Sequence, residues 1–194
     1  MDCPFDDLML FITGPTWLRP EVRAAGAWPE FGHRDSENAN RFFDIFRNLG
    51  IIADLPDGYQ TIILPGSGST GMEAAIRSMV SDDETIMHVT IGAFGDLWYK
   101  ISQLNGKKTI KLSFPAGTAV EIDSFEKALK RHKPAVVAIT HNETSTGVMN
   151  DIVSLTRLAK KYNALVLVDG VSIFGGAPSR SEEHTSELQS RLHL

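Results

Sequence analysis

Two kinds of apolar pattern alternate along the chain from about residue 59 onward. Short runs that are apolar throughout, such as AVVAIT and ALVLV, predict strands that are buried on both faces. Stretches with apolar residues three and four positions apart predict amphipathic helices between them. The alternation predicts an α/β fold, a mostly parallel sheet with helices on both faces. The predicted strands are 61–64, 85–90, 109–114, 135–140 and 164–168, and the predicted helices are 72–80, 96–104, 124–132 and 152–162.

Two of these helices carry start signals. Asp123 is expected to cap the helix over 124–132, with Glu126 three positions later, close to a capping box. Asp151 is expected to cap the helix over 152–162. The sequence thus predicts where both helices begin.

The first 58 residues follow a different pattern. Proline and glycine interrupt this segment repeatedly, and only residues 38–49 (NANRFFDIFRNL) predict a clear helix. We therefore expect an N-terminal arm and helix over residues 1–58. Residues 59–178 are expected to form part of a larger domain.

The chain ends in a segment that continues neither pattern. Residues 180–190 read RSEEHTSELQS, which resembles the in-frame translation of a common DNA-sequencing adapter. Residues 179–194 are therefore expected to be a non-native tail and play no part in the fold prediction. The chain is accordingly expected to be a gene fragment.

Composition narrows the class of protein. The chain has 194 residues, 42% of them hydrophobic, and a formal net charge of −5. This mild acidity, with no cluster of Lys or Arg, argues against nucleic acid as a partner. The single cysteine, Cys3, excludes an intramolecular disulfide and a multi-cysteine metal site, and no metal is expected. There is no apolar run of membrane-spanning length and no basic flank of a secretory signal, so a cytoplasmic protein without a membrane partner is expected.

A turn rich in glycine and serine follows the first predicted strand. Residues 61–80, TIILPGSGSTGMEAAIRSMV, predict a strand, this turn and a helix. Such a turn offers free N–H groups and the positive end of the helix dipole, which suits phosphate. Gly66, Gly68 and Gly71 also spell the G-x-G-x-x-G of dinucleotide-binding proteins, but the next strand ends without the acidic residue that would bind ribose. A non-catalytic nucleotide-binding or interaction module therefore remains an alternative, as does a plain tight turn.

Polar or aromatic residues come directly after four of the predicted strands. The glycine turn follows the first, GAFG with Phe94 follows the second, HNETSTG at 141–147 follows the fourth, and Asp169 follows the fifth. Ligands of open parallel sheets bind beyond the carboxyl ends of the strands. A phosphate cradle, an exposed aromatic ring, a hydroxyl-rich loop and a carboxylate together suit a planar, phosphorylated ring that contains nitrogen, such as pyridoxal phosphate.

These motifs resemble those of the class V aminotransferases, which are fold-type I pyridoxal-phosphate enzymes, and in particular the alanine/serine–glyoxylate aminotransferases. The resemblance implies part of the fold-type I large domain, and pyridoxal 5′-phosphate as cofactor. Ser67, Gly68 and Ser69 would then hold the cofactor phosphate. The motifs that carry the resemblance are LFITGPTWLRPEV, GHRDSE, PGSGSTGMEAA, GAFGD, THNETSTGVMND and VDGVSIFGG.

The resemblance also implies roles for single residues. Phe94 would stack on the pyridine ring, and Asp169 would keep the ring nitrogen protonated, so that the ring can accept electrons. Thr144 would bind the phenolic oxygen of the cofactor or line its pocket. Plainer alternatives are that Phe94 is a core side chain and that Asp169 caps the following turn. His141 and Glu143 lie in the same loop without an assigned step.

Two further residues are expected near the substrate. His33 and Arg34 belong to GHRDSE, which by the resemblance would lie close to the active site, within one subunit or across a dimer interface. An arginine there would bind a substrate carboxylate with two parallel hydrogen bonds. A solvated turn is the alternative.

The activity that the resemblance implies is transfer of an amino group from alanine or serine to a 2-oxo acid such as glyoxylate or pyruvate, by a homodimer in the full-length protein. A lyase or a 2-aminoethylphosphonate transaminase on the same scaffold remains open. In the family the Schiff-base lysine follows the next strand, and this chain has no lysine after Lys161. The chain itself is therefore predicted to be inactive.

Overall fold

The computed structural model describes residues 10–177, and the chain divides after Ile45 into two units. Helix α1 (Pro20–Ala25) lies in the first unit, and α2 (Ser36–Ile52) crosses the division. The helix predicted over 38–49 is therefore present and longer than expected. This division comes earlier in the chain than the domain boundary predicted at residue 58. The predicted domain extents stay a prediction. The tail predicted over 179–194 lies outside the described residues.

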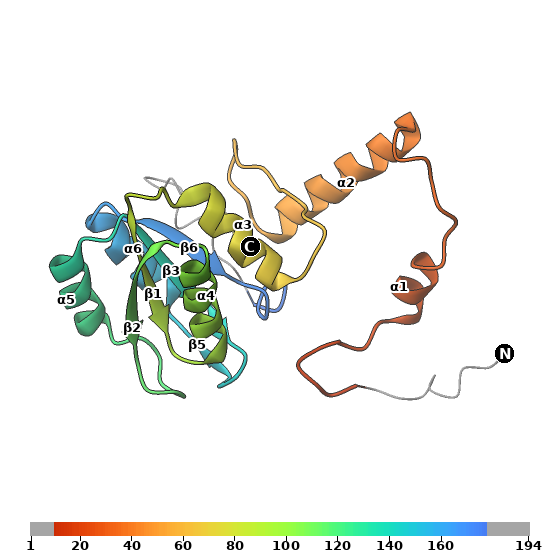
Figure 1. The fold of residues 1–194 in the computed structure, drawn as a ribbon. Coiled ribbons are helices and arrows are strands. Elements are labelled where there is room, and N and C mark those ends of the chain that lie inside the picture. The colour runs from red at the N-terminus through yellow and green to blue at the C-terminus, as the bar shows by residue number, and fades with distance from the viewer. Residues whose placement is uncertain (1–9, 178–194) are drawn as a thin grey trace. The chain divides into compact units, whose positions relative to one another are not determined.

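Four parallel strands form the main sheet of the second unit (Figure 1). They are β1 (Thr85–Thr90), β2 (Lys108–Ser113), β3 (Val136–Thr140) and β6 (Leu165–Asp169), in the order β2-β1-β3-β6. The predicted parallel sheet is confirmed. Because all four strands run the same way, their carboxyl ends share one edge.

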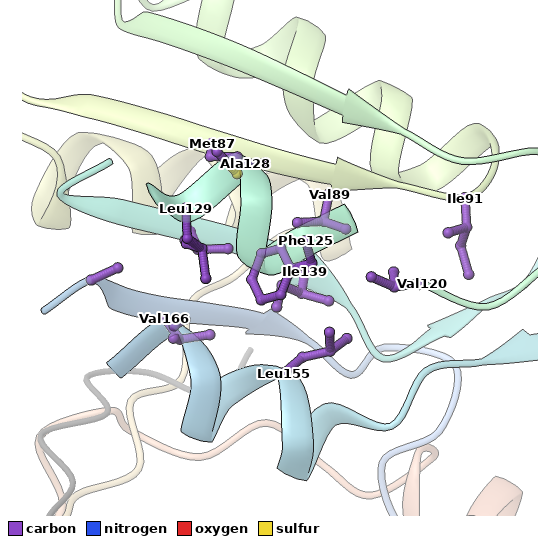
Figure 2. Close-up of a cluster of buried hydrophobic side chains, with 13 residues drawn as sticks. Met87, Val89, Ile91, Val120, Phe125, Ala128, Leu129, Ile139, Leu155 and Val166 are labelled. Carbon is purple, nitrogen blue, oxygen red and sulfur yellow. The ribbon is translucent and has the colours of Figure 1, made fainter. Parts of the chain in front are cut away.

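Helices cover both faces of this sheet, as predicted (Figure 1). On one face, α5 (Ile122–His132) and α6 (Ile152–Lys161) pack on side chains of the strands. Figure 2 shows Phe125 and Leu129 of α5 and Leu155 of α6 in that layer. On the other face, α3 (Gly68–Met79) and α4 (Ala93–Leu104) enclose a second core with Ile76 and Trp98. Period-two alternation along β1, β3 and β6 supplies both cores, whereas Ile110 and Leu112 of β2 pack against the first core only.

The predicted strand over residues 61–64 does not form. These residues have no regular secondary structure, and Ile62, Ile63 and Leu64 are exposed. A strand needs a neighbour to satisfy its backbone N–H and C=O groups. Within the described residues the sheet ends at β2 on one side and at β6 on the other. The apolar pattern was correct for a strand, but no partner strand is present in this part of the chain.

The two helices that follow glycine turns begin earlier than predicted. Helix α3 begins at Gly68 rather than at residue 72, and α4 begins at Ala93 rather than at residue 96. Glycine and small polar residues are poor helix formers, so the apolar pattern starts late in both helices. In α4, side chains of Glu143 and Ser145 accept hydrogen bonds from the first turn and so stabilise this early start.

One of the two predicted caps is confirmed and the other is wrong. Asp151 caps α6, since its Oδ1 accepts a hydrogen bond from Ser154 N at 3.1 Å. Asp123 lies inside α5, whose N-cap is Glu121. Glu126 does not complete a capping box, and instead accepts a hydrogen bond from the Tyr162 hydroxyl at 2.6 Å, which joins α5 to α6. Tertiary contact thus overrides the local signal.

Candidate functional site

The last residues of β3 and β6 lie side by side at the carboxyl edge of the sheet. Thr140 is paired with Asp169, and both are buried. Ala138 and Leu167, two positions earlier, belong to the core on the α3/α4 face, so alternation places Thr140 and Asp169 on that face too. The Thr140 hydroxyl lies beside the Asp169 carboxyl, where it lowers the pKa of that group. A hydroxyl and a carboxylate therefore meet at the strand ends, on the side where α3 and α4 lie.

Thr70 stabilises the glycine turn before α3 through two hydrogen bonds to Ser67. Thr70 Oγ1 accepts a hydrogen bond from Ser67 N at 3.2 Å, and Thr70 N donates to Ser67 O at 2.9 Å. Gly66 has φ +153°, and a Cβ there would lie 2.4 Å from Thr70 Oγ1. Only glycine leaves room for this arrangement.

The N-terminus of α3 is open to a ligand. Gly68 and Ser69 occupy the first two helical positions, where backbone N–H groups have no partner inside a helix, and both residues are exposed. No acidic residue lies in the first turn of α3. Of the three residues predicted to bind phosphate, Ser67 has its N–H engaged by Thr70, so Gly68 and Ser69 supply the free backbone donors.

The start of α3 lies against the segment that follows Asp169. A Cβ placed on Gly68 would come within 3.0 Å of Val171 Cγ2, and Val171 N donates to Asp169 Oδ1 at 3.0 Å. The structure therefore brings the glycine turn and Asp169 to the same edge of the sheet, although about a hundred residues separate them in sequence.

The N-terminus of α4 is occupied by a side chain of the protein. Glu143 is fully buried, and its carboxylate accepts hydrogen bonds from Phe94 N at 3.1 Å and from Gly95 N at 3.1 Å. Ser145 Oγ accepts a third bond, from Ala93 N at 3.0 Å. Two helix N-termini thus lie at this edge, and the one at α3 is free for an external anion.

Phe94 lies in the first turn of α4 rather than in a loop. Its side chain is 39% exposed, so it is not the core residue of the plainer alternative. An aromatic ring held at a fixed backbone position and open to solvent is suited to stacking on a planar ligand. The stacking itself stays a prediction.

Asp169 combines burial with a fixed orientation. Burial raises the pKa of its carboxyl above the ordinary value, the hydrogen bond from Val171 N lowers it, and the nearby Glu143 charge raises it. The bond from Val171 means that Asp169 does cap the following turn, as the plainer alternative holds. This turn uses only Oδ1, so capping does not prevent the second carboxylate oxygen from binding a ligand.

The loop after β3 folds into a short hairpin that the sequence analysis missed. Strands β4 (Asn142–Glu143) and β5 (Val148–Met149) pair antiparallel, and Gly147 N donates to Glu143 O at 2.8 Å to close the turn. The signal was Ser-Thr-Gly between two short segments that can extend. The hairpin holds Thr144, which is half-buried and has no recorded hydrogen bond in the described part of the chain.

His141 acts here through its backbone. His141 N donates to Asp169 O at 2.9 Å, and His141 O accepts from Asn150 N at 2.8 Å. The side chain is half-buried, and burial lowers the pKa of its imidazole below the ordinary value. His141 therefore links β3 to the end of β6.

His33 and Arg34 lie in the first unit, and both are exposed. They form part of the turn before α2, in which Asp35 N donates to Gly32 O at 3.0 Å. The solvated-turn alternative describes their surroundings within this unit. Their approach to the substrate stays a prediction.

A cavity of about 660 Å³ adjoins the glycine turn. Its walls are mostly apolar. Of the residues predicted to bind phosphate, Ser67 and Gly68 line it. Phe94, Thr144 and Asp169 do not line it. The cavity lies beside the unpaired segment 61–64, from which Thr61, Ile62 and Leu64 line it.

Residues 10–177 meet neither the requirements of a metal site nor those of a membrane-spanning helix. No group of three or more His, Cys, Asp or Glu residues there is placed to hold a metal ion. Within the same residues, every helix is too short or too polar to span a bilayer.

Known proteins are similar to this chain in sequence and in fold. The family model described as aminotransferase class-V matches residues 51–185. The chain is 32% identical to the L-aspartate–glyoxylate aminotransferase of Paracoccus denitrificans and 31% identical to the serine–glyoxylate aminotransferase of Hyphomicrobium methylovorum, in both cases over 90% of this chain. A crystal structure of alanine–glyoxylate aminotransferase from Nostoc sp. has the same fold, with a TM-score of 0.83 and 24% identity, over 94% of this chain and 51% of that one.

The fold is thus part of the large domain of the fold-type I pyridoxal-phosphate enzymes. The chain belongs to the class V aminotransferase family. It covers 45% and 44% of the two relatives from Paracoccus and Hyphomicrobium, so it spans less than half the length of the curated relatives it matches. The predicted family and fold class are confirmed.

Proposed function

We propose that the full-length protein is a pyridoxal-phosphate-dependent aminotransferase and that this chain carries much of its cofactor site. The observation that carries the proposal is the meeting of an open helix N-terminus, at Gly68 and Ser69, with the buried carboxylate of Asp169 through Val171. A phosphate at one end and a ring nitrogen at the other would satisfy both groups.

The residues at this edge fit the cofactor chemically. Ser67, Gly68 and Ser69 would hold the phosphate through N–H and hydroxyl groups, and Phe94 would contact the ring face. Asp169 would accept a hydrogen bond from the protonated ring nitrogen, for which its burial provides a low local dielectric. Thr144 would bind the phenolic oxygen or line the pocket, since the hairpin holds it half-buried beside the first turn of α4.

When bound, pyridoxal phosphate supplies an electron sink for the carbanion that forms at the substrate α-carbon. The residues of this chain bind and orient that group, and Asp169 holds the proton on the ring nitrogen. We propose alanine or serine as amino donor and glyoxylate or pyruvate as acceptor, because the named relatives include serine–glyoxylate and alanine–glyoxylate aminotransferases. His33 and Arg34 would lie near the substrate, in a homodimer of the full-length protein.

The binding proposal is tested with pyridoxamine 5′-phosphate, which has no aldehyde and so does not condense with surface lysines. We expect saturable binding by the 194-residue chain, detected by tryptophan fluorescence. Asp169→Asn keeps an oxygen that can accept from Val171 N but removes the charge, so the affinity should fall by about 10- to 100-fold. Asp151→Asn, the same change at the N-cap of α6, should leave the affinity unaltered.

NAD serves as the competing ligand in the same titration. Saturable binding of NAD without binding of pyridoxamine phosphate would favour the nucleotide-binding module instead. Equal affinity of the Asp169→Asn protein and the parent would remove Asp169 from the site.

The chain as it stands should not transaminate. It has no lysine after Lys161, and the three lysines nearest its end lie on α6 or before it, away from the carboxyl edge. A coupled assay with alanine and glyoxylate, on protein cleared of host enzymes, should show no pyruvate above the level without protein. Turnover that is lost in Asp169→Asn would contradict this prediction.

A further inference from the structure

Glu143 is a buried acidic residue to which sequence reasoning gave no role. Its side chain is completely buried, and every hydrogen bond recorded for its carboxylate is one that it accepts. Oε2 accepts hydrogen bonds from the N–H groups of Phe94 and Gly95, at 3.1 Å each. Oε1 accepts a hydrogen bond from the Ser145 hydroxyl at 2.6 Å. A buried carboxylate is tolerated only when such donors replace water.

The chain leaves room for this carboxylate at Gly92. A Cβ at position 92 would lie 2.5 Å from Glu143 Cγ and 2.6 Å from Ser145 Oγ. The backbone of Gly92 is extended, so its conformation does not itself require glycine. The requirement is the close approach of the hairpin, which joins the loop after β3 to the first turn of α4.

The contacts of Glu143 coincide with residues of the proposed cofactor site. It bonds directly to the backbone of Phe94, and it is the chain neighbour of Thr144. It is also close enough to Asp169 for its charge to raise the pKa of that carboxyl. A simple helix cap would explain the bonds to α4 alone, whereas Glu143 joins α4 to the β4–β5 hairpin, and each of these two segments carries one proposed cofactor contact.

We propose that Glu143 is a positioning residue of the cofactor site, whose buried carboxylate fixes the first turn of α4 and the β4–β5 hairpin so that Phe94 and Thr144 face the ring. The inference rests on the proposed function, since it concerns the same ligand. Glu143 itself does not touch the cofactor in this arrangement. It acts through the residues that it holds.

The test is Glu143→Gln in the 194-residue chain, with pyridoxamine 5′-phosphate as probe. Glutamine has nearly the same shape but only one acceptor oxygen, so its NH₂ group must face either the N–H groups of α4 or Ser145. We expect faster amide hydrogen exchange at Phe94 and Gly95, about tenfold weaker binding of the probe, and a smaller induced circular dichroism of the bound ring. Asp151→Asn is the matched control, because Asp151 caps α6 in the same way, away from this edge.

A double-mutant cycle separates positioning from general loss of stability. In a Phe94→Ala background, Glu143→Gln should weaken probe binding by clearly less than in the parent, because the residue through which it acts is gone. Fold-changes that simply multiply would overturn the proposal, as would equal losses in Glu143→Gln and Asp151→Asn.

The remaining outcomes are also decisive. If the parent binds the probe and Glu143→Gln binds it equally well, the positioning role is wrong and the proposed function stands. If the parent does not bind, the cofactor proposal fails and this inference fails with it. Should Glu143→Gln not fold, Ser145→Ala removes one donor to Oε1, and we expect about threefold weaker binding; unchanged binding would overturn the proposal.

Discussion

Replacing His88 by phenylalanine should remove a large part of the loss of stability that this chain suffers in acid. His88 is 1% exposed near the centre of the sheet, and burial lowers its pKa from 6.5 to about 3. Between these values the unfolded chain holds a proton that the folded chain does not. Stability therefore falls as pH drops below 6.5, by up to about 1.4 kcal/mol per pH unit, and this contribution is absent above that window.

Phenylalanine removes the titration and keeps most of the packing. The imidazole contacts Trp98 and Tyr99 edge-on, with ring centroids 6.0 and 5.8 Å away, which a phenyl ring can reproduce. His88 Nε2 is buried without a hydrogen-bond partner in the described residues, so its loss leaves no other group unsatisfied. At neutral pH the variant should be as stable as the parent.

Urea unfolding of both proteins between about pH 7 and pH 5 provides the measurement. The difference in unfolding free energy should grow in favour of His88→Phe as pH falls, while the opposite contribution of Asp169, common to both, cancels. Parallel slopes for His88→Phe and the parent would show that the pKa of His88 is the same in the folded and the unfolded chain.

Gly92→Ala should destabilise the chain by about 3 kcal/mol, at the upper end of what overpacking costs. The added methyl group would overlap Glu143 and Ser145, and neither can withdraw without giving up hydrogen bonds to α4. The same change at Gly50, inside α2, meets only Leu55 Cδ1 at 3.9 Å. Gly50→Ala should stabilise the chain by up to about 1 kcal/mol, because alanine is the better helix former.

Thermal or urea unfolding measures the change in unfolding free energy for each variant. The same replacement of glycine by alanine should lower this free energy at position 92 and raise it at position 50. Equal effects of Gly92→Ala and Gly50→Ala would mean that the hairpin can move away from α4. In that case the close approach at Gly92 would not be a constraint on the fold.

The strands and helices that were predictable are those decided by their own residues. The run AVVAI is apolar at every position, and β3 is buried at every position. Asp151 caps its own helix, and Asp169 ends its own strand, so both could be placed from local sequence. Such features need no knowledge of which elements are neighbours.

What the sequence could not predict depends on strand order. Glu143 reaches α4 because β3 lies next to β1, although β2 comes between them in the chain. The failure of residues 61–64 to form a strand has the same origin, because no local signal tells whether a partner strand is present. Glu126 bonds to Tyr162 for a similar reason, since α5 and α6 share one face of the sheet.

The strand order β2-β1-β3-β6 also has a consequence for synthesis on the ribosome. After β1 and β2 have paired, β3 joins the free side of β1, and β6 then joins the free side of β3. Each new strand is added at an edge, so no hydrogen bond formed earlier has to break. The sheet can therefore grow strand by strand while the polypeptide is still being translated.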